Sequence, residues 1–156
     1  MKVHKVYNEI KAHETEISQA LQIDLGKSEP EAFMCEIGMV LSEITYMIKH
    51  MKSFSKKQRL RTPLAQFHAK SYKQLCPHGN VLIMSPWNYP FLLTIEPLVD
   101  ALAAGNTAII KPSAYSPATS ALVKEIMENC FLPEYVAVVM GGRKENSELL
   151  NKKFDF

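Results

Sequence analysis

The sequence lacks both of the glycine-rich fingerprints that usually mark a phosphate-binding loop. Its 156 residues include only six glycines, and neither G-x-G-x-x-G nor G-x-x-x-x-G-K-[ST] occurs. The five histidines show no ligand spacing, so we expect no metal site. These absences exclude the commonest nucleotide-binding and metal-binding motifs.

Cysteine and long apolar runs are also scarce. The three cysteines, Cys35, Cys76 and Cys130, are an odd number without C-x-x-C spacing. This pattern predicts reduced thiols in a cytoplasmic protein. The N-terminus carries charges throughout, which does not fit a signal peptide. No apolar run is long enough to cross a bilayer, so we expect no membrane segment.

Positive and negative side chains are nearly balanced in number, with a formal net charge of +2. That value is too small to imply a nucleic-acid or membrane partner. Basic residues do gather between Lys49 and Arg61. They are typical either of a nucleic-acid or phosphate patch, or of a helix C-terminus followed by a solvated loop. We favour the second interpretation, because no aromatic platform is interleaved.

The composition is that of an ordinary globular domain, 47% hydrophobic and 22% charged. Apolar spacing predicts an amphipathic helix from about Val3 to Leu25, ended by Gly26. The run Ser28-Glu-Pro-Glu31 is a capping box that opens a second helix. The apolar stripe of that helix comprises Phe33, Ile37, Val40, Leu41, Ile44, Met47, Ile48 and Met51.

The stretch from Arg61 to Pro77 has no helical period. Two extended pieces, Leu64–Ala69 and Ser71–Leu75, suggest a hairpin arm. An arm that leaves the core usually pairs with another subunit or domain.

The stretch from Asn80 to Lys111 predicts a βαβ unit. A short apolar run, Val81–Met84, is typical of a buried parallel strand. The segment 85–90 contains two prolines and breaks that strand. A helix then ends at Gly105-Asn106, and Thr107–Ile110 reads as the next strand.

A second αβ unit follows the first. Ser116-Pro117 begins a helix to about Cys130, with Ala118, Ala121, Leu122 and Ile126 facing inward. Tyr135–Met140 reads as a third strand, followed by Gly141-Gly142, and residues 147–150 form a short helix. The predicted fold class is therefore α/β, with a βαβαβ core that is half of a dinucleotide-binding architecture.

Polar segments follow all three predicted strands: 85–88, 111–113 and 141–142. Right-handed crossovers bring the carboxyl ends of parallel strands to one rim, where open α/β sheets bind ligands. The Asn88 amide is either an oxyanion donor or a turn asparagine bonded to its own backbone. Lys111 is either a ligand for phosphate or ribose or an ordinary surface lysine. Gly141 would allow close approach of a cofactor.

Three motifs at fixed spacing resemble the aldehyde dehydrogenase superfamily. They are PWNYP at 86–90, PL-x4-AAGN at 97–106 and KPS at 111–113. The WNYPF form, the segments 24–28 and 36–44, and the end of the chain from Gly141 to Asp155 resemble the class 3, fatty-aldehyde-like bacterial branch.

The resemblance implies NAD(P)-dependent oxidation of an aldehyde to an acid, on a Rossmann-like domain. Asn88 matches the oxyanion-hole asparagine, and Tyr89 lies where the branch lines its substrate tunnel. Matching the cofactor-binding set are Ser85, Pro86, Trp87, Lys111, Ser113 and Gly141. The arm matches the one that the family uses to form oligomers, so a homodimer of the complete enzyme is expected.

Two departures from the family pattern have consequences. Ala114 replaces the glutamate of KPSE, which repels a 2′-phosphate, so we expect NADP to be tolerated as well as NAD. None of the three cysteines has the context of the family nucleophile. We therefore expect an N-terminal piece of a longer enzyme, inactive alone: helices in 1–55, the arm in 56–78, and a partial cofactor domain in 79–156. The alternative is a non-catalytic cofactor-binding or interaction fragment that associates with a full-length homologue.

Overall fold

A parallel sheet forms the centre of the computed structural model, which describes residues 2–156. Its strands lie in the order β3-β4-β5, and their bounds are Asn80–Met84, Thr107–Lys111 and Val136–Val138. Helices α5 (Leu92–Ala103) and α6 (Pro117–Cys130) make the two crossovers. This is the predicted Rossmann-like βαβαβ core. The third strand is shorter than the predicted Tyr135–Met140, because the ladder with β4 ends at the pair Ile110–Val138.

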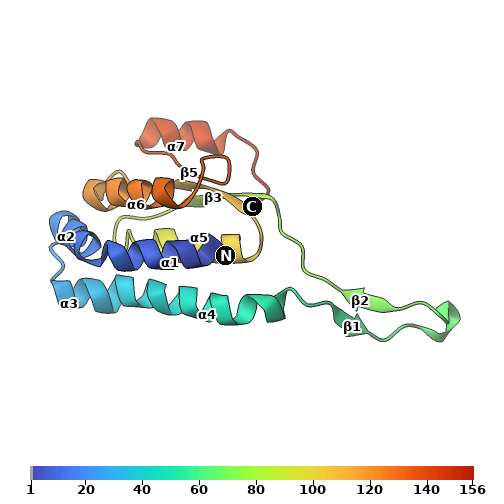
Figure 1. Ribbon diagram of the computed structural model, residues 1–156. Helices are drawn as coiled ribbons and strands as arrows, with labels where there is room; N and C mark the ends of the chain where they lie inside the picture. Colours follow the sequence, from blue (N-terminus) through green and yellow to red (C-terminus); the bar gives the residue numbers. More distant parts are fainter. Residues whose placement is uncertain (1) are drawn as a thin grey trace.

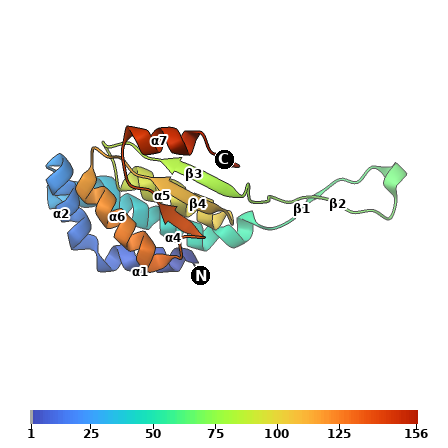
Figure 2. The same ribbon diagram turned by 90° about the horizontal axis from the view of Figure 1, so that it is seen from above.

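The N-terminal helices form a layer over the crossover helices (Figures 1 and 2). They are α1 (Lys2–Ala12), α2 (Glu14–Leu25), α3 (Glu29–Ala32) and α4 (Gly38–Phe54). Helices α1 and α2 contact α6, and α4 contacts α5. Helix α7 (Arg143–Leu150) lies on the side of the sheet away from α1 and α4 (Figure 1). The buried core therefore joins the N-terminal segment to the sheet through α5 and α6.

The predicted first helix is broken at His13. This residue has φ −107° and ψ 21°, outside the helical region, and it separates α1 from α2. Ile10 before the break and Ile17 after it are both buried in the core. The predicted stop is confirmed, since Gly26 adopts a left-handed φ of 69° and its amide donates to Gln22.

The second helix contains a π-turn, Phe33–Ile37, that the apolar pattern did not predict. A π-turn adds one residue to the helical repeat, so the inward stripe begins at Ala32 and Phe33 is exposed. The same shift turns Glu36 into the core. The capping box is also wrong, because the Ser28 side chain makes no cap hydrogen bond.

Helix α6 is capped at both ends by the N-terminal segment. The Asp24 carboxylate accepts from the amides of Ala118 and Thr119, at 3.1 and 2.7 Å. At the other end, Lys5 Nζ donates to the carbonyls of Asn129 and Cys130, at 2.8 and 3.1 Å. A carboxylate at the amino end and an ammonium at the carboxyl end both favour the helix dipole.

The inward face of α6 differs from the predicted one. Ala121 is exposed, whereas Thr119, Ser120 and Val123 are buried. The small polar residues fit there because the helix is covered on two sides, by α1 and α2 and by β5.

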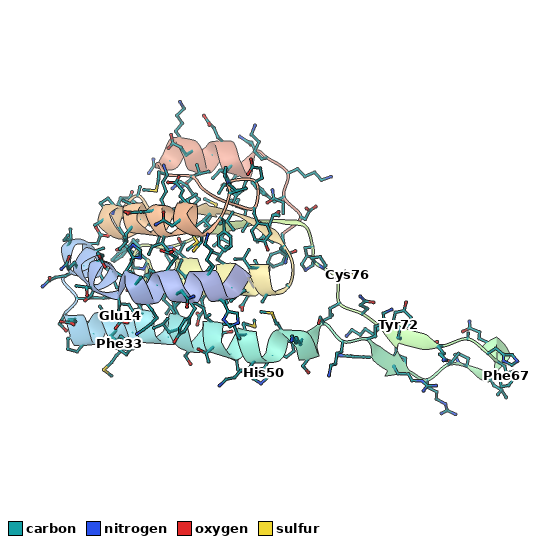
Figure 3. The ribbon with its side chains drawn as sticks, in the orientation of Figure 1. Glu14, Phe33, His50, Phe67, Tyr72 and Cys76 are labelled. Atoms are coloured by element: carbon teal, nitrogen blue, oxygen red, sulfur yellow. The ribbon has the colours of Figure 1, made fainter. Side chains whose placement is uncertain are left out.

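The hairpin arm is present, although one of its predicted strands is misplaced. Strands β1 (Gln58–Leu60) and β2 (Ser71–Lys73) pair antiparallel, and Leu64–Gln66 forms a 3₁₀ turn instead of an extended piece. The arm projects from the body, with Phe67 near its tip and Tyr72 on β2 (Figure 3).

The chain continues along the free edge of β3 at its C-terminal end. The Asp155 amide donates to the Asn80 carbonyl, and the Leu82 amide donates to the Phe156 carbonyl, both at 2.9 Å. Among residues 2–156, no helix is both long and apolar enough to cross a membrane. The same residues contain no group of three or more His, Cys, Asp or Glu side chains placed to hold a metal ion.

Candidate cofactor rim and oxyanion turn

The polar segments that follow β3, β4 and β5 lie on one rim, as the parallel register requires. The Ser85 amide, just after β3, donates to the Lys111 carbonyl at the end of β4, at 3.2 Å. Lys111 in turn reaches the segment after β5, because its Nζ donates to the Gly141 carbonyl at 2.6 Å. One side chain therefore links the second and third strand ends.

Lys111 is a buried residue, with a relative exposure of 2%. Its Nζ also donates to the Pro112 carbonyl at 2.8 Å, so the ammonium is held by two carbonyl dipoles. Burial lowers the pKa of Lys111 below its ordinary value of 10.5, and the Glu145 carboxylate opposes this shift. The surface-lysine interpretation of Lys111 is wrong.

The glycine pair after β5 is stabilised by Glu145. Gly141 has a φ of 131°, and a Cβ there would lie 2.5 Å from the Glu145 side chain. The Gly142 amide donates to Glu145 Oε2 at 2.7 Å. Backbone hydrogen bonds from its own amide and from Gly142 lower the pKa of Glu145. The Glu145 carboxylate therefore stays charged at neutral pH, and its hydrogen bond with Gly142 stabilises the tight turn after β5.

An open hollow of about 500 Å³ lies at this rim. The predicted residues Ser85, Pro86, Lys111 and Ser113 all line it. Its other lining residues are Met84, Pro112, Ala114, Tyr115, Gly142, Arg143 and Asn146. Asn146 Oδ1 is buried without a hydrogen-bond partner among the described residues. An ammonium, a hydroxyl and an orphaned amide oxygen are a donor and acceptor set that fits the hydroxyl groups of a ribose.

The remaining predicted residues lie beside the hollow, not in its lining. Trp87 is 55% exposed, and Asn88 and Tyr89 are also exposed, on the turn before α5. Gly141 belongs to the rim through its carbonyl but does not line the hollow. The structure thus brings the candidate residues together as two neighbouring groups. One lines the hollow, and the other lies on the turn between β3 and α5, residues 85–91.

Thr94 closes the turn from inside α5. Its hydroxyl lies 2.6 Å from Ser85 Oγ and 2.5 Å from the Pro90 carbonyl. The turn is thereby closed on itself at both of its ends.

A second set of contacts reaches the same turn from the N-terminal helices. Lys27 Nζ lies 2.5 Å from Glu36 Oε1, and the other Glu36 oxygen accepts from the amides of Phe91 and Leu92, at 2.9 and 3.0 Å. Lys27 Nζ also lies 4.1 Å from the centre of the Tyr89 ring. The sequence pattern missed this pair. The only signal was an acidic residue beside the inward stripe, which becomes inward through the π-turn.

The three cysteines lie apart from the hollow lining. Cys76 is exposed before β3, and Cys130 ends α6, both on the amino side of the strands. Burial raises the pKa of Cys130 to about 11, so its thiol is protonated at neutral pH. Cys35 is half-buried in the π-turn.

The βαβαβ topology and the polar rim define the class of the chain as Rossmann-like α/β. A model of the aldehyde dehydrogenase family matches residues 2–155. The chain belongs to the aldehyde dehydrogenase family.

Relatives of known sequence support the same assignment. The chain is 43% identical over 152 residues to 4,4′-diaponeurosporen-aldehyde dehydrogenase of Staphylococcus aureus, covering 97% of this chain and 33% of that one. It is 41% identical over 143 residues to aldehyde dehydrogenase family 3 member H1 of Arabidopsis thaliana, covering 92% and 30%. The chain thus spans about a third of the length of these relatives.

Solved structures of aldehyde dehydrogenases also match the fold of this chain. A structure of the substrate-bound state of Staphylococcus aureus AldH has a TM-score of 0.93 at 42% identity, covering 96% of this chain and 32% of that chain. Succinic semialdehyde dehydrogenase of Streptococcus pyogenes, in complex with NADP⁺, has a TM-score of 0.82 at 18% identity, covering 97% and 32%. The second likeness extends to the fold alone.

Proposed function

We propose that the rim hollow holds the adenosine half of NAD(P). The observation that carries this proposal is the buried Lys111 ammonium beside Ser113 and the unpartnered Asn146 oxygen in one hollow. Lys111 would exchange its bonds to Gly141 and Pro112 for bonds to ribose hydroxyls. Bound NAD(P) would supply the hydride acceptor of the reaction.

The hollow also suits the 2′-phosphate of NADP. Ala114 places no carboxylate there, and Arg143, which lines the same hollow, adds a positive charge. Ala114→Glu should weaken NADP binding by about tenfold or more and leave NAD binding nearly unchanged. Equilibrium dialysis with both cofactors measures this. NAD binding a hundredfold tighter than NADP in the unaltered chain would contradict the proposal.

The turn residue Asn88 would act on the aldehyde. In the family reaction a thiolate adds to the aldehyde carbon, and the carbonyl oxygen becomes an oxyanion. The Asn88 amide would donate to that oxygen, while Tyr89 would line the approach of the substrate. Loss of a single oxyanion donor typically lowers kcat by about 10²–10³-fold.

A chimera provides the test of this role. Residues 1–156 replace the matching third of the Staphylococcus aureus relative, and aldehyde-dependent NAD(P)H formation is followed. Asn88→Ala should lower kcat within that range with little change in the KM for NADP. Asn129→Ala, on the exposed end of α6, is the control. An unchanged kcat in Asn88→Ala would contradict the assignment.

The cysteines of this chain do not supply the thiolate in this proposal. Cys76 and Cys130 lie on the amino side of the sheet, and the Cys130 thiol is protonated at neutral pH. The purified 156-residue chain should therefore bind cofactor without oxidising aldehydes. Turnover well above background, lost in Cys35→Ser, would overturn this part of the proposal.

The arm would join two copies of the enzyme. Its apolar side chains include Leu64 and Phe67, exposed by 87% and 74%. Burial of such exposed apolar area against another subunit favours association. In sedimentation experiments on the chimera, Leu64→Ser with Phe67→Ser should shift a dimer toward monomer. The alternative, association of the chain with a full-length homologue, rests on the same exposed arm. Co-sedimentation of the 156-residue chain with the complete relative tests it.

A further inference from the structure

We propose that Lys27 and Glu36 form a clamp that positions the candidate oxyanion turn (residues 85–91) and the start of α5. The catalytic consequence of the clamp rests on the proposed function of Asn88, whereas the clamp itself does not. Both are positioning residues, because they contact the turn and not a reacting group. The contacts that carry the proposal come from two buried residues of the N-terminal segment, Lys27 between α2 and α3 and Glu36 in the π-turn.

The Glu36 carboxylate satisfies the beginning of α5. Phe91 is the N-cap of α5 and Leu92 is its first residue, so no earlier carbonyl of the helix accepts from their amides. Glu36 Oε2 accepts from both, and the side chain has a relative exposure of 0%. A carboxylate at this place also favours the positive end of the helix dipole.

Lys27 extends the clamp from the helix start to Asn88. Its Nζ lies 2.5 Å from Glu36 Oε1 and donates to the Asn88 carbonyl at 3.4 Å. It also lies over the Tyr89 ring, with 4.1 Å to the ring centre. One ammonium therefore contacts two consecutive residues of the turn.

Two local features of the backbone bring the pair together. Gly26, in a left-handed conformation, ends α2 and directs Lys27 back into the core. The π-turn rotates Glu36 inward, and Gly38 permits it, since a Cβ there would lie 2.9 Å from the Phe33 carbonyl. π-turns are frequent at functional sites, where an irregular backbone serves a placement.

Stability alone does not account for a pair at this place. Burying two charges costs several kcal/mol in desolvation, and apolar residues of similar volume often serve a core equally well. What an apolar pair cannot do is accept two amides and contact the Asn88 carbonyl together. The clamp therefore couples the N-terminal helices to the geometry of the turn.

Hydrogen exchange of the 156-residue chain tests the clamp without cofactor or aldehyde. In Lys27→Met, the amides of Phe91 and Leu92 should exchange about tenfold faster or more, with exchange in β4 unchanged. Lys27→Arg should restore most of the protection. The control is Lys11→Met, which removes an exposed ion pair of the same 2.5 Å length with Glu14. Anisotropy of Trp87, the single tryptophan, should fall in Lys27→Met alone.

Two results would overturn the clamp. One is wild-type exchange at Phe91 and Leu92 in Lys27→Met. The other is equal acceleration throughout the sheet, which would indicate a global loss of stability. In the chimera, Lys27→Met should lower kcat by tenfold or somewhat more at constant KM for NADP. If exchange accelerates locally but kcat does not change, the clamp stands and the role of Asn88 fails.

Discussion

Many apolar side chains are buried in the body of the molecule (residues 2–55 and 79–156), whereas those of the arm (residues 56–78) are exposed. In the body, Leu98 and its neighbours on α5 are fully buried between α4 and the sheet. In the arm, Leu64, Phe67 and Tyr72 are exposed to solvent. Figure 3 shows Phe67 and Tyr72 on the projecting arm. The body is therefore stabilised by contacts within the chain, whereas the arm has apolar area to offer to another surface. The two regions should respond differently to the same substitution.

Leucine to alanine in each region should give the largest difference. Leu98→Ala removes a buried side chain and leaves a cavity, so unfolding should become easier by about 2–5 kcal/mol. Leu64→Ala, the matched change in the arm, should stay within about 0.5 kcal/mol. Urea denaturation followed by circular dichroism measures both. Equal losses would show that the arm packs on the body in solution.

A smaller loss of unfolding free energy is expected where Asp24 of the N-terminal segment caps α6. Asp24→Ala removes the acceptor for two amides at the start of α6, and should lower the unfolding free energy by about 1–2 kcal/mol. Glu128→Ala, on the exposed side of the same helix, is the control. Equal stability of these two variants would mean that the cap does not hold the N-terminal helices to α6.

The smallest effect is expected at the junction between arm and body. Asp100 and Cys76 line one hollow there, together with the end of α4. Burial raises the pKa of Asp100 above 3.8, and Glu43 and Glu96 add to it. The carboxylate of Asp100 therefore destabilises the folded state at pH values above this raised pKa, where the group is charged.

Asp100→Asn should therefore raise the melting temperature at pH 7. The gain should shrink as the pH falls through the raised pKa of Asp100, and vanish below 3.8, where both folded and unfolded states are protonated. Melting curves at several pH values test the sign. A constant gain at all pH values would point to packing and not to charge.

Local pattern predicts the sheet and the rim well, for a physical reason. Buried parallel strands are continuous apolar runs, and proline and glycine mark the ends of elements, as Pro86 does after β3 and Gly105 after α5. The crossovers then force the strand ends onto one rim, so the grouping of Ser85 with Lys111 was predictable from the chain order.

What the sequence did not predict depends on partners far along the chain. The cap of α6 comes from Asp24, 94 residues before Ala118. The burial of Glu36 depends on a π-turn and on amides 55 residues away. Helical periodicity assumes a regular repeat and treats a charged residue as exposed, so it cannot find a buried pair formed by an irregular turn.

Equilibrium dialysis of the 156-residue chain with labelled NADP determines whether the rim binds the cofactor. We expect one saturable site, weakened about tenfold or more by Lys111→Met and unchanged by Lys144→Met on the exposed side of α7. Absence of saturable binding to the folded chain, or equal affinity in the Lys111→Met variant, would contradict the cofactor rim.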